Sequence, residues 1–165
     1  MNLSTDDIQV RDDGGLLPEE RVVLFTLSGC ELGIPIHLAR EIIRVPDITR
    51  MPKAPAFLEG VINLRGRIIP VLDLKKRFDM PLLDRTEETR ILIVQLKDQS
   101  MGLLVDKVTE VLRYALEAVV TPKESILNIG VDYTEGFLMI GTRLVTLLKM
   151  ERVFNVEEMK PFLEK

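Results

Sequence analysis

The chain has 165 residues, of which 46% are hydrophobic and 29% charged, and its formal net charge at pH 7 is −4. This composition is too apolar for an intrinsically disordered chain, and the length fits one or two small domains. Cys30 is the single cysteine and His37 the single histidine, which excludes a disulfide framework and the usual zinc clusters. The apolar runs have the length of strands, so we expect no insertion into a membrane and a cytoplasmic location.

The first 20 residues hold the negative charge of the chain. Residues 1–20 contain six acidic side chains and one basic side chain, Arg11. They show no helical or alternating pattern, so we predict a flexible acidic arm that either solubilises the protein or docks on a basic partner. The remaining chain is nearly neutral, which argues against nucleic acid as a ligand because phosphate binding requires clustered Lys and Arg.

An internal repeat follows the arm. Residues 21–45 align with residues 90–114, and residues 60–74 align with residues 136–150. The offset grows from 69 to 76 positions, which places an insertion in the polar stretch Thr121–Thr134. Identical residues of the two copies include Arg21/Arg90, Gly33/Gly102, Glu41/Glu110, Gly60/Gly136 and Arg67/Arg143. The repeat predicts two structural units of the same kind.

Each copy of the repeat contains short apolar runs that are separated by turns. In the first copy the turns lie at residues 28–30 and 65–66, and in the second at residues 97–99 and 141–142. Short runs around glycine or polar turns are typical of antiparallel strands. About five such strands per copy are enough to close a small barrel.

The protein is therefore predicted to be all-β, with two five-stranded β-barrels in tandem and a few short helices. The barrels are expected over about residues 21–80 and 88–155, joined by a polar linker at Leu83–Thr89, and a single sandwich is the alternative. Short helical turns are predicted at residues 37–44 and at 73–78, where Asp73 is a suitable N-cap. The last ten residues, 156–165, are predicted to form a short helix or a tail.

No candidate catalytic or metal site satisfies its chemistry. His37 and Glu41 share a helical spacing, but two ligands are too few for a metal. The segment from Gly60 to Gly66 has five residues between its glycines and lacks the Lys-Ser/Thr of a phosphate loop. Cys30 lies in a turn, and the chain has only one histidine that could activate its thiol as a nucleophile. We therefore predict no enzyme activity, no cofactor and no metal.

One polar segment stands out between two apolar runs, namely Asn63-Leu-Arg-Gly-Arg67. It is either an ordinary hairpin with solvated arginines or a turn that presents an arginine to a partner. An arginine can hold a carboxylate through two parallel hydrogen bonds when its geometry is fixed in advance. Glu41 is a candidate intramolecular partner that would hold Arg65 or Arg67 in place.

The segment Gly60-Val-Ile-Asn-Leu-Arg-Gly-Arg-Ile-Ile-Pro-Val-Leu-Asp-Leu74 resembles the signature of the CheW family, the adaptors of bacterial chemotaxis arrays. Gly33-Ile-Pro-Ile, Gly102-Leu-Leu-Val-Asp106 and Tyr133-Thr-Glu-Gly136 also fit the family pattern in order and approximate spacing. The resemblance covers about residues 20–155.

This resemblance implies a single CheW-like domain over residues 21–155, made of two SH3-like barrels. It also allows the barrels to exchange a strand, which would move the sequential boundaries by one element. The implied function is a scaffold that couples chemoreceptors to the histidine kinase CheA. The implied partners are the regulatory domain of CheA, the cytoplasmic hairpin tip of the receptors and other CheW-like domains in rings. An adaptor of a non-flagellar pathway such as pilus motility, or a small-ligand-binding barrel, are the alternatives.

The partner-binding residues that the resemblance implies by position are Glu41, Asn63, Arg65, Gly66, Gly102 and Val111. Glu41 and Arg65 match family residues that bind partners and hold the site together, and Asn63 and Gly66 shape the turn. Gly102 and Val111 match positions that line the groove between the barrels, where the receptor tip is expected.

Overall fold

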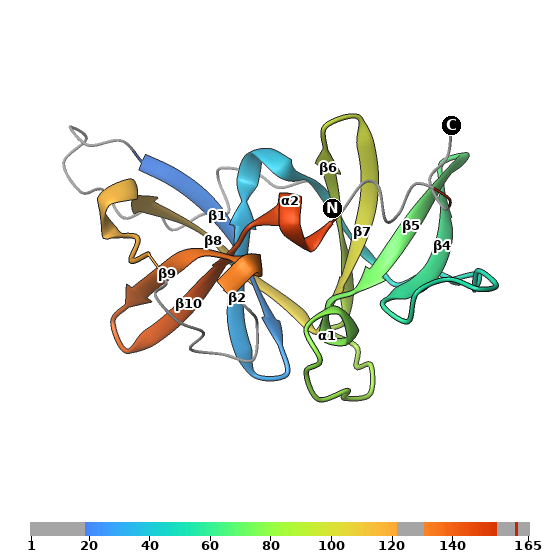
Figure 1. Cartoon of the computed structure of the whole chain (residues 1–165), viewed down its shortest axis with the longest axis horizontal. Coiled ribbons are helices and arrows are strands. Elements are labelled where there is room, and N and C mark those ends of the chain that lie inside the picture. The colour runs from blue at the N-terminus through green and yellow to red at the C-terminus, as the bar shows by residue number, and fades with distance from the viewer. Residues whose placement is uncertain (1–18, 122–130, 155–160, 162–165) are drawn as a thin grey trace.

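A computed structural model describes residues 19–121, 131–154 and 161, which form two five-stranded sheets and a few short helices (Figure 1). The strands are β1 (Glu19–Leu27), β2 (Cys30–Pro35), β3 (Ala39–Arg44), β4 (Leu58–Leu64), β5 (Arg67–Asp73), β6 (Arg90–Leu96), β7 (Gln99–Val105), β8 (Lys107–Ala115), β9 (Thr134–Ile140) and β10 (Arg143–Leu148). The helices are η2 (Ile36–Leu38), α1 (Leu74–Arg77), η3 (Leu116–Ala118), η4 (Val131–Tyr133) and α2 (Met150–Val153). Within this described part, no helix is both long and apolar enough to cross a membrane.

The strand order defines two barrels. Barrel A has the order β8-β1-β2-β10-β9, and barrel B has the equivalent order β3-β6-β7-β5-β4. Neighbouring strands are antiparallel except for the parallel pairs β2/β10 and β5/β7. In each sheet, an isolated β-bridge joins the segment that follows one outer strand to the other outer strand. In barrel A, Val120, which follows β8, pairs with Phe137 of β9, and in barrel B, Thr49, which follows β3, pairs with Val61 of β4. Each bridge has two backbone hydrogen bonds of 2.8–2.9 Å, so both sheets are closed.

The two barrels are not sequential. Barrel B is formed by the continuous stretch from β3 to β7, whereas barrel A combines β1 and β2 with β8 to β10. The predicted barrel boundaries at residues 21–80 and 88–155 are therefore wrong. The predicted linker Leu83–Thr89 does not separate the barrels but connects α1 to β6 within the stretch of chain that forms barrel B. A whole hairpin is exchanged between the halves, not one strand. Because the two repeats supply equivalent strands, the hydrophobic pattern of each strand is the same whether the barrels are sequential or exchange a hairpin.

Three apolar clusters fill the molecule. A cluster of six buried residues, including Ile62 and Ile91, lies within barrel B, and a cluster of five, including Leu24 and Val145, lies within barrel A. The largest cluster has 21 buried residues among those described and draws on both barrels. The β1–β2 hairpin supplies alternate side chains to both sides, since Leu24 faces the interior of barrel A and Phe25 belongs to the large cluster. We refer to the large cluster as the shared core.

The short helices follow the sequence only in part. Asp73 caps α1 as predicted, because its Oδ1 accepts hydrogen bonds from the backbone N–H groups of Lys75 and Lys76. The helix predicted at residues 37–44 is wrong beyond η2, since residues 39–44 form β3 and pair with β6. The β-branched pair Ile42-Ile43 favours a strand there. The acidic arm lies outside the described residues apart from Glu19 and Glu20, which begin β1, and the predicted C-terminal element lies outside them apart from residue 161.

Two repeated glycines lie where the barrels close. A Cβ atom on Gly60 would collide with the carbonyl oxygen of Thr49, and one on Gly136 would collide with the side chain of Val119. Gly60 also has a φ of +153°, which L side chains rarely adopt. Thr49 is the bridge residue of barrel B, and Val119 precedes the bridge residue of barrel A. A glycine at the same position of both repeats therefore reflects the closure of the barrels.

We expect Gly60→Ala to destabilise the protein by at least about 3 kcal/mol, because it adds a backbone collision to an unfavourable φ. Gly29→Ala is the matched control, since Gly29 has a φ of +83° but open space around the added Cβ. The control is expected to cost only about 1–2 kcal/mol. Equilibrium urea unfolding measures both values, and equal costs would contradict the role of Gly60 in closure.

Candidate functional site

The β4–β5 hairpin ends in a two-residue turn. Leu64 pairs with Arg67, and the two turn residues between them, Arg65 and Gly66, have φ angles of +51° and +84°. Two positive φ angles are the mark of a type I′ turn, whose twist matches that of the strands. The Oδ1 atom of Asn63 accepts a hydrogen bond of 2.9 Å from the backbone N–H of Gly66. The backbone therefore directs the Arg65 side chain out of the barrel end.

Glu41 on β3 holds Arg65 in position. The Nη2 atom of Arg65 lies 2.9 Å from both carboxylate oxygens of Glu41. The Glu41 side chain is only 13% exposed, whereas the Arg65 side chain is 71% exposed. Of the two arginines that the sequence offered to Glu41, it is Arg65 that the structure pairs with it. Since β3 and β4 are the outer strands of the sheet of barrel B, this ion pair also spans the closure of the barrel.

Gly102 and Val111 do not belong to this site. A Cβ atom on Gly102 would lie 2.6 Å from the Ile91 side chain and 3.4 Å from the Val71 side chain, so this glycine faces the interior of barrel B. Val111 is 9% exposed and is part of the shared core. The structure therefore brings together four of the six predicted residues and buries the other two.

Barrel A contains an ion cluster at the equivalent hairpin that the sequence reading missed. Arg143 on β10 donates from Nε and Nη2 to the two carboxylate oxygens of Glu31, at 2.9 and 2.5 Å, and from Nη2 to Glu110 at 2.7 Å. Glu110 is the repeat counterpart of Glu41, and Arg143 is the counterpart of Arg67. The identities in the repeat were the signal that would have revealed this cluster.

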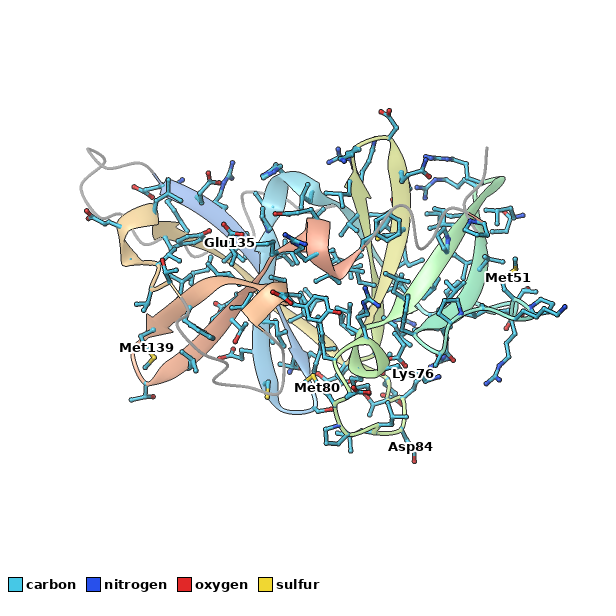
Figure 2. The ribbon with its side chains drawn as sticks, viewed as in Figure 1. Met51, Lys76, Met80, Asp84, Glu135 and Met139 are labelled. Atoms are coloured by element: carbon cyan, nitrogen blue, oxygen red, sulfur yellow. The ribbon has the colours of Figure 1, made fainter. Side chains whose placement is uncertain are left out.

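The two hairpin ends nevertheless present different chemistry. The counterpart of Asn63 is Met139, which is 59% exposed and lies at the β9–β10 hairpin (Figure 2). The counterpart of Arg65 is Gly141, which carries no side chain at all. Only barrel B therefore presents an arginine from its turn.

The ion cluster of barrel A shifts the pKa of its own members. The hydrogen bonds from Arg143 lower the pKa of Glu31 below its usual 4.5, although burial opposes this shift. The same hydrogen bonds from Glu31 and Glu110 raise the pKa of Arg143. The arginine of barrel A therefore makes three hydrogen bonds to carboxylates of its own chain.

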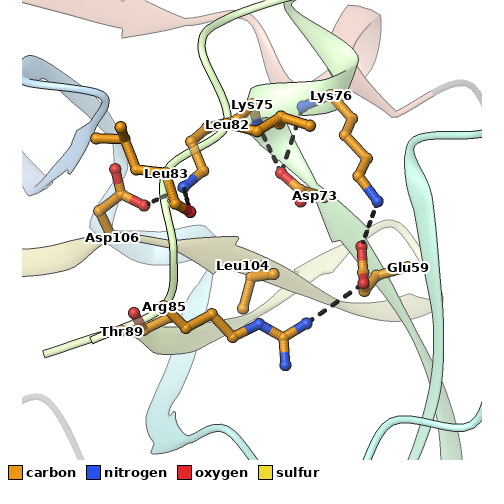
Figure 3. A pocket seen from close by; sticks show the side chains of 10 residues that line it. All are labelled: Glu59, Asp73, Lys75, Lys76, Leu82, Leu83, Arg85, Thr89, Leu104 and Asp106. Carbon is orange, nitrogen blue, oxygen red and sulfur yellow. Dashed lines mark hydrogen bonds and ion pairs between the residues drawn. The ribbon is translucent and has the colours of Figure 1, made fainter. Parts of the chain in front are cut away.

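A small pocket of about 120 Å³ lies between α1, the loop that follows it and the end of β7 (Figure 3). The Lys75 side chain, 8% exposed, donates to Asp106 at 2.6 Å and to the Leu83 carbonyl at 3.2 Å. Asp106 also accepts a hydrogen bond of 2.7 Å from the backbone N–H of Ser28 in the β1–β2 turn. The charges of this pocket thus pair with one another, and they connect α1 with both barrels.

Among the described residues, no group of three or more His, Cys, Asp and Glu side chains is placed to hold a metal ion. Cys30 is a free thiol at the start of β2. The arrangement that remains is an exposed arginine, fixed by a carboxylate on a closed barrel, which suits recognition of another protein.

Comparison with known proteins places the chain in a family. The model of the CheW-like domain matches residues 21–158. The chemotaxis protein CheW of Treponema pallidum is 32% identical over 144 residues, which cover 85% of each chain. The crystal structure of the scaffolding protein TtCheW from Thermoanaerobacter tengcongensis superposes with a TM-score of 0.81 at 31% identity, covering 93% of this chain and 99% of that one. The chain belongs to the CheW-like domain family, and its barrels are of the SH3-like kind.

Arg143→Gln is expected to lower the free energy of unfolding by about 1 kcal/mol at pH 7, because a networked surface ion pair is lost. The folded state lowers the pKa of Glu31 from 4.5, so this contribution is complete above pH 4.5 and disappears as the pH falls through the lowered pKa. The stability difference between wild type and variant should therefore shrink in acid. Urea unfolding across this pH range measures it, and a difference independent of pH would contradict the role given to Arg143.

Proposed function

We propose that this member of the CheW-like family is a non-catalytic adaptor that couples chemoreceptors to the histidine kinase CheA in the cytoplasm. The observation that carries the proposal is the exposed Arg65, which Glu41 holds in place at the end of a barrel, within the residues that the family model matches. The partners proposed are the regulatory domain of the kinase, the hairpin tip of the receptors and further CheW-like domains in rings.

The relatives support this proposal by their names. The Treponema protein is a chemotaxis protein, and TtCheW is a scaffolding protein. Both match this chain across most of their own length. A scaffold requires surfaces on a stiff body and needs no reactive group.

The structure suggests how such a scaffold would work. The shared core makes the two barrels one body, so a partner that moves one barrel also moves the other. The fixed guanidinium of Arg65 retains donors for a partner's oxygen atoms and pays little entropy on binding because Glu41 has already ordered it. Individually modest contacts would add up when many adaptors are linked in an array. Signal transfer is then a change in the population of relative positions.

A second function within the same family has a specific observation behind it. The protein PilI of Pseudomonas aeruginosa is 31% identical over 84 residues, which cover 51% of this chain. An adaptor of a pilus-linked chemosensory pathway would use the same fold with a different receptor and kinase. The longer match to chemotaxis proteins favours the first function, and binding tests with both sets of partners separate the two.

Arg65→Ala is expected to weaken binding to a cognate kinase regulatory domain or receptor fragment by about 1–3 kcal/mol, because a charged hydrogen bond to the partner is lost. The variant should remain folded, since the Arg65 side chain is 71% exposed. Isothermal titration calorimetry with each partner measures the affinities, and circular dichroism checks the fold.

Arg85→Ala is the matched control for this comparison. Arg85 is also paired with a carboxylate, Glu59 at 3.3 Å, and its side chain is 48% exposed. It lies at the pocket, at the opposite end of β5 from the hairpin turn. The control should bind like wild type. Wild-type protein that binds neither partner would remove the adaptor function, and an Arg65→Ala variant that binds normally would reduce the turn to an ordinary hairpin.

A further inference from the structure

Arg67 is the arginine of the hairpin that Glu41 does not hold. It is exposed at the start of β5, and within the described part of the chain its side chain makes one hydrogen bond, from Nη2 to the Ser100 hydroxyl at 3.3 Å. A guanidinium has five N–H donors arranged to match a carboxylate. Most of the hydrogen-bonding capacity of Arg67 is therefore open to solvent.

The other barrel shows what completes the same arrangement. The repeat relates Arg67 to Arg143 and Ser100 to Glu31. In barrel A the carboxylate of Glu31 accepts two hydrogen bonds from Arg143, through Nε and Nη2. Both pairs lie on the parallel strands β10/β2 and β5/β7, so their backbones have the same relation. Barrel B keeps the arginine and replaces its carboxylate partner with a short hydroxyl.

We propose that Arg67 binds a carboxylate of a partner protein, an aspartate or glutamate that occupies the position filled by the Glu31 carboxylate in barrel A. This inference deepens the proposed function, on which it rests for the identity of the partner. The charges agree with it, since Arg65, Arg67 and Glu41 leave an excess positive charge at this end. In barrel A, Arg143 with Glu31 and Glu110 leaves a negative one. An uncompensated guanidinium on the same turn as Arg65 both attracts and orients an acidic surface.

The test is to supply the missing carboxylate from the chain itself. Ser100→Glu should pair with Arg67 as Glu31 pairs with Arg143, and so exclude the partner's carboxylate. We expect affinity for the kinase regulatory domain or the receptor fragment to fall about tenfold, the equivalent of one charged hydrogen bond. Ser100→Gln has the same size without the charge and should bind within about twofold of wild type. Thermal unfolding should show that neither substitution lowers stability.

A second measurement does not depend on the identity of the partner. Sodium acetate is titrated into the free protein while the arginine Nε–Hε resonances are followed by NMR. The Arg67 resonance should shift, the Arg143 resonance should not, and Ser100→Glu should abolish the response of Arg67.

The outcomes separate the two claims. Wild-type protein that binds neither partner, with a normal acetate response at Arg67, would overturn the adaptor function and leave the carboxylate site in place. Wild-type affinity in Ser100→Glu, or an Arg67 resonance that responds to acetate no more than Arg143, would overturn the carboxylate site and leave the adaptor function in place.

Discussion

The structure depends on an apolar core that belongs to neither barrel alone. The interiors of the barrels hold six and five buried residues, whereas the shared core holds 21 of the described ones. Small barrels have little interior volume, and strands of both barrels, notably β1, β2, β6 and β7, bury a second face in the shared core. The exchanged hairpins place barrel B between the two segments of barrel A in the sequence, and unfolding either barrel would expose the core residues against which the other packs. The ion pair between the buried Lys75 and the partly exposed Asp106 adds a polar connection beside the apolar one.

The repeat keeps the architecture constant and lets the surface differ. Glycines at the closures and an acidic residue on the equivalent strands β3 and β8 are the same in both copies. The hairpin turns have diverged, so that barrel A satisfies its arginine internally while barrel B presents Arg65 and Arg67. A partner that recognises fixed positive charge would therefore distinguish the two ends of a nearly symmetric body. This difference in charge lets the adaptor bind such a partner in one defined orientation.

The sequence predicted most of the strands, their turns and two five-stranded barrels, because strand periodicity and turn chemistry are local, but it predicted a helix where β3 lies. It also predicted the Asp73 cap and named Glu41 as a partner for a turn arginine. It could not predict the hairpin exchange, since the equivalent strands of the two repeats offer equivalent edges for pairing. The family resemblance implies a groove position for Gly102, whereas in the structure this glycine packs against Ile91 in the interior of barrel B. The Arg143 cluster was overlooked because its three residues are far apart in the sequence.

The central claim is that the two barrels form a single cooperative body. The chain has no tryptophan, so the most direct measurement is equilibrium urea unfolding followed by NMR at backbone amides in each interior, such as Leu138 in barrel A and Ile62 in barrel B. A shared core and exchanged hairpins predict one transition with the same midpoint and the same denaturant dependence at both amides. Two separate transitions, with one barrel remaining folded after the other has unfolded, would contradict the account.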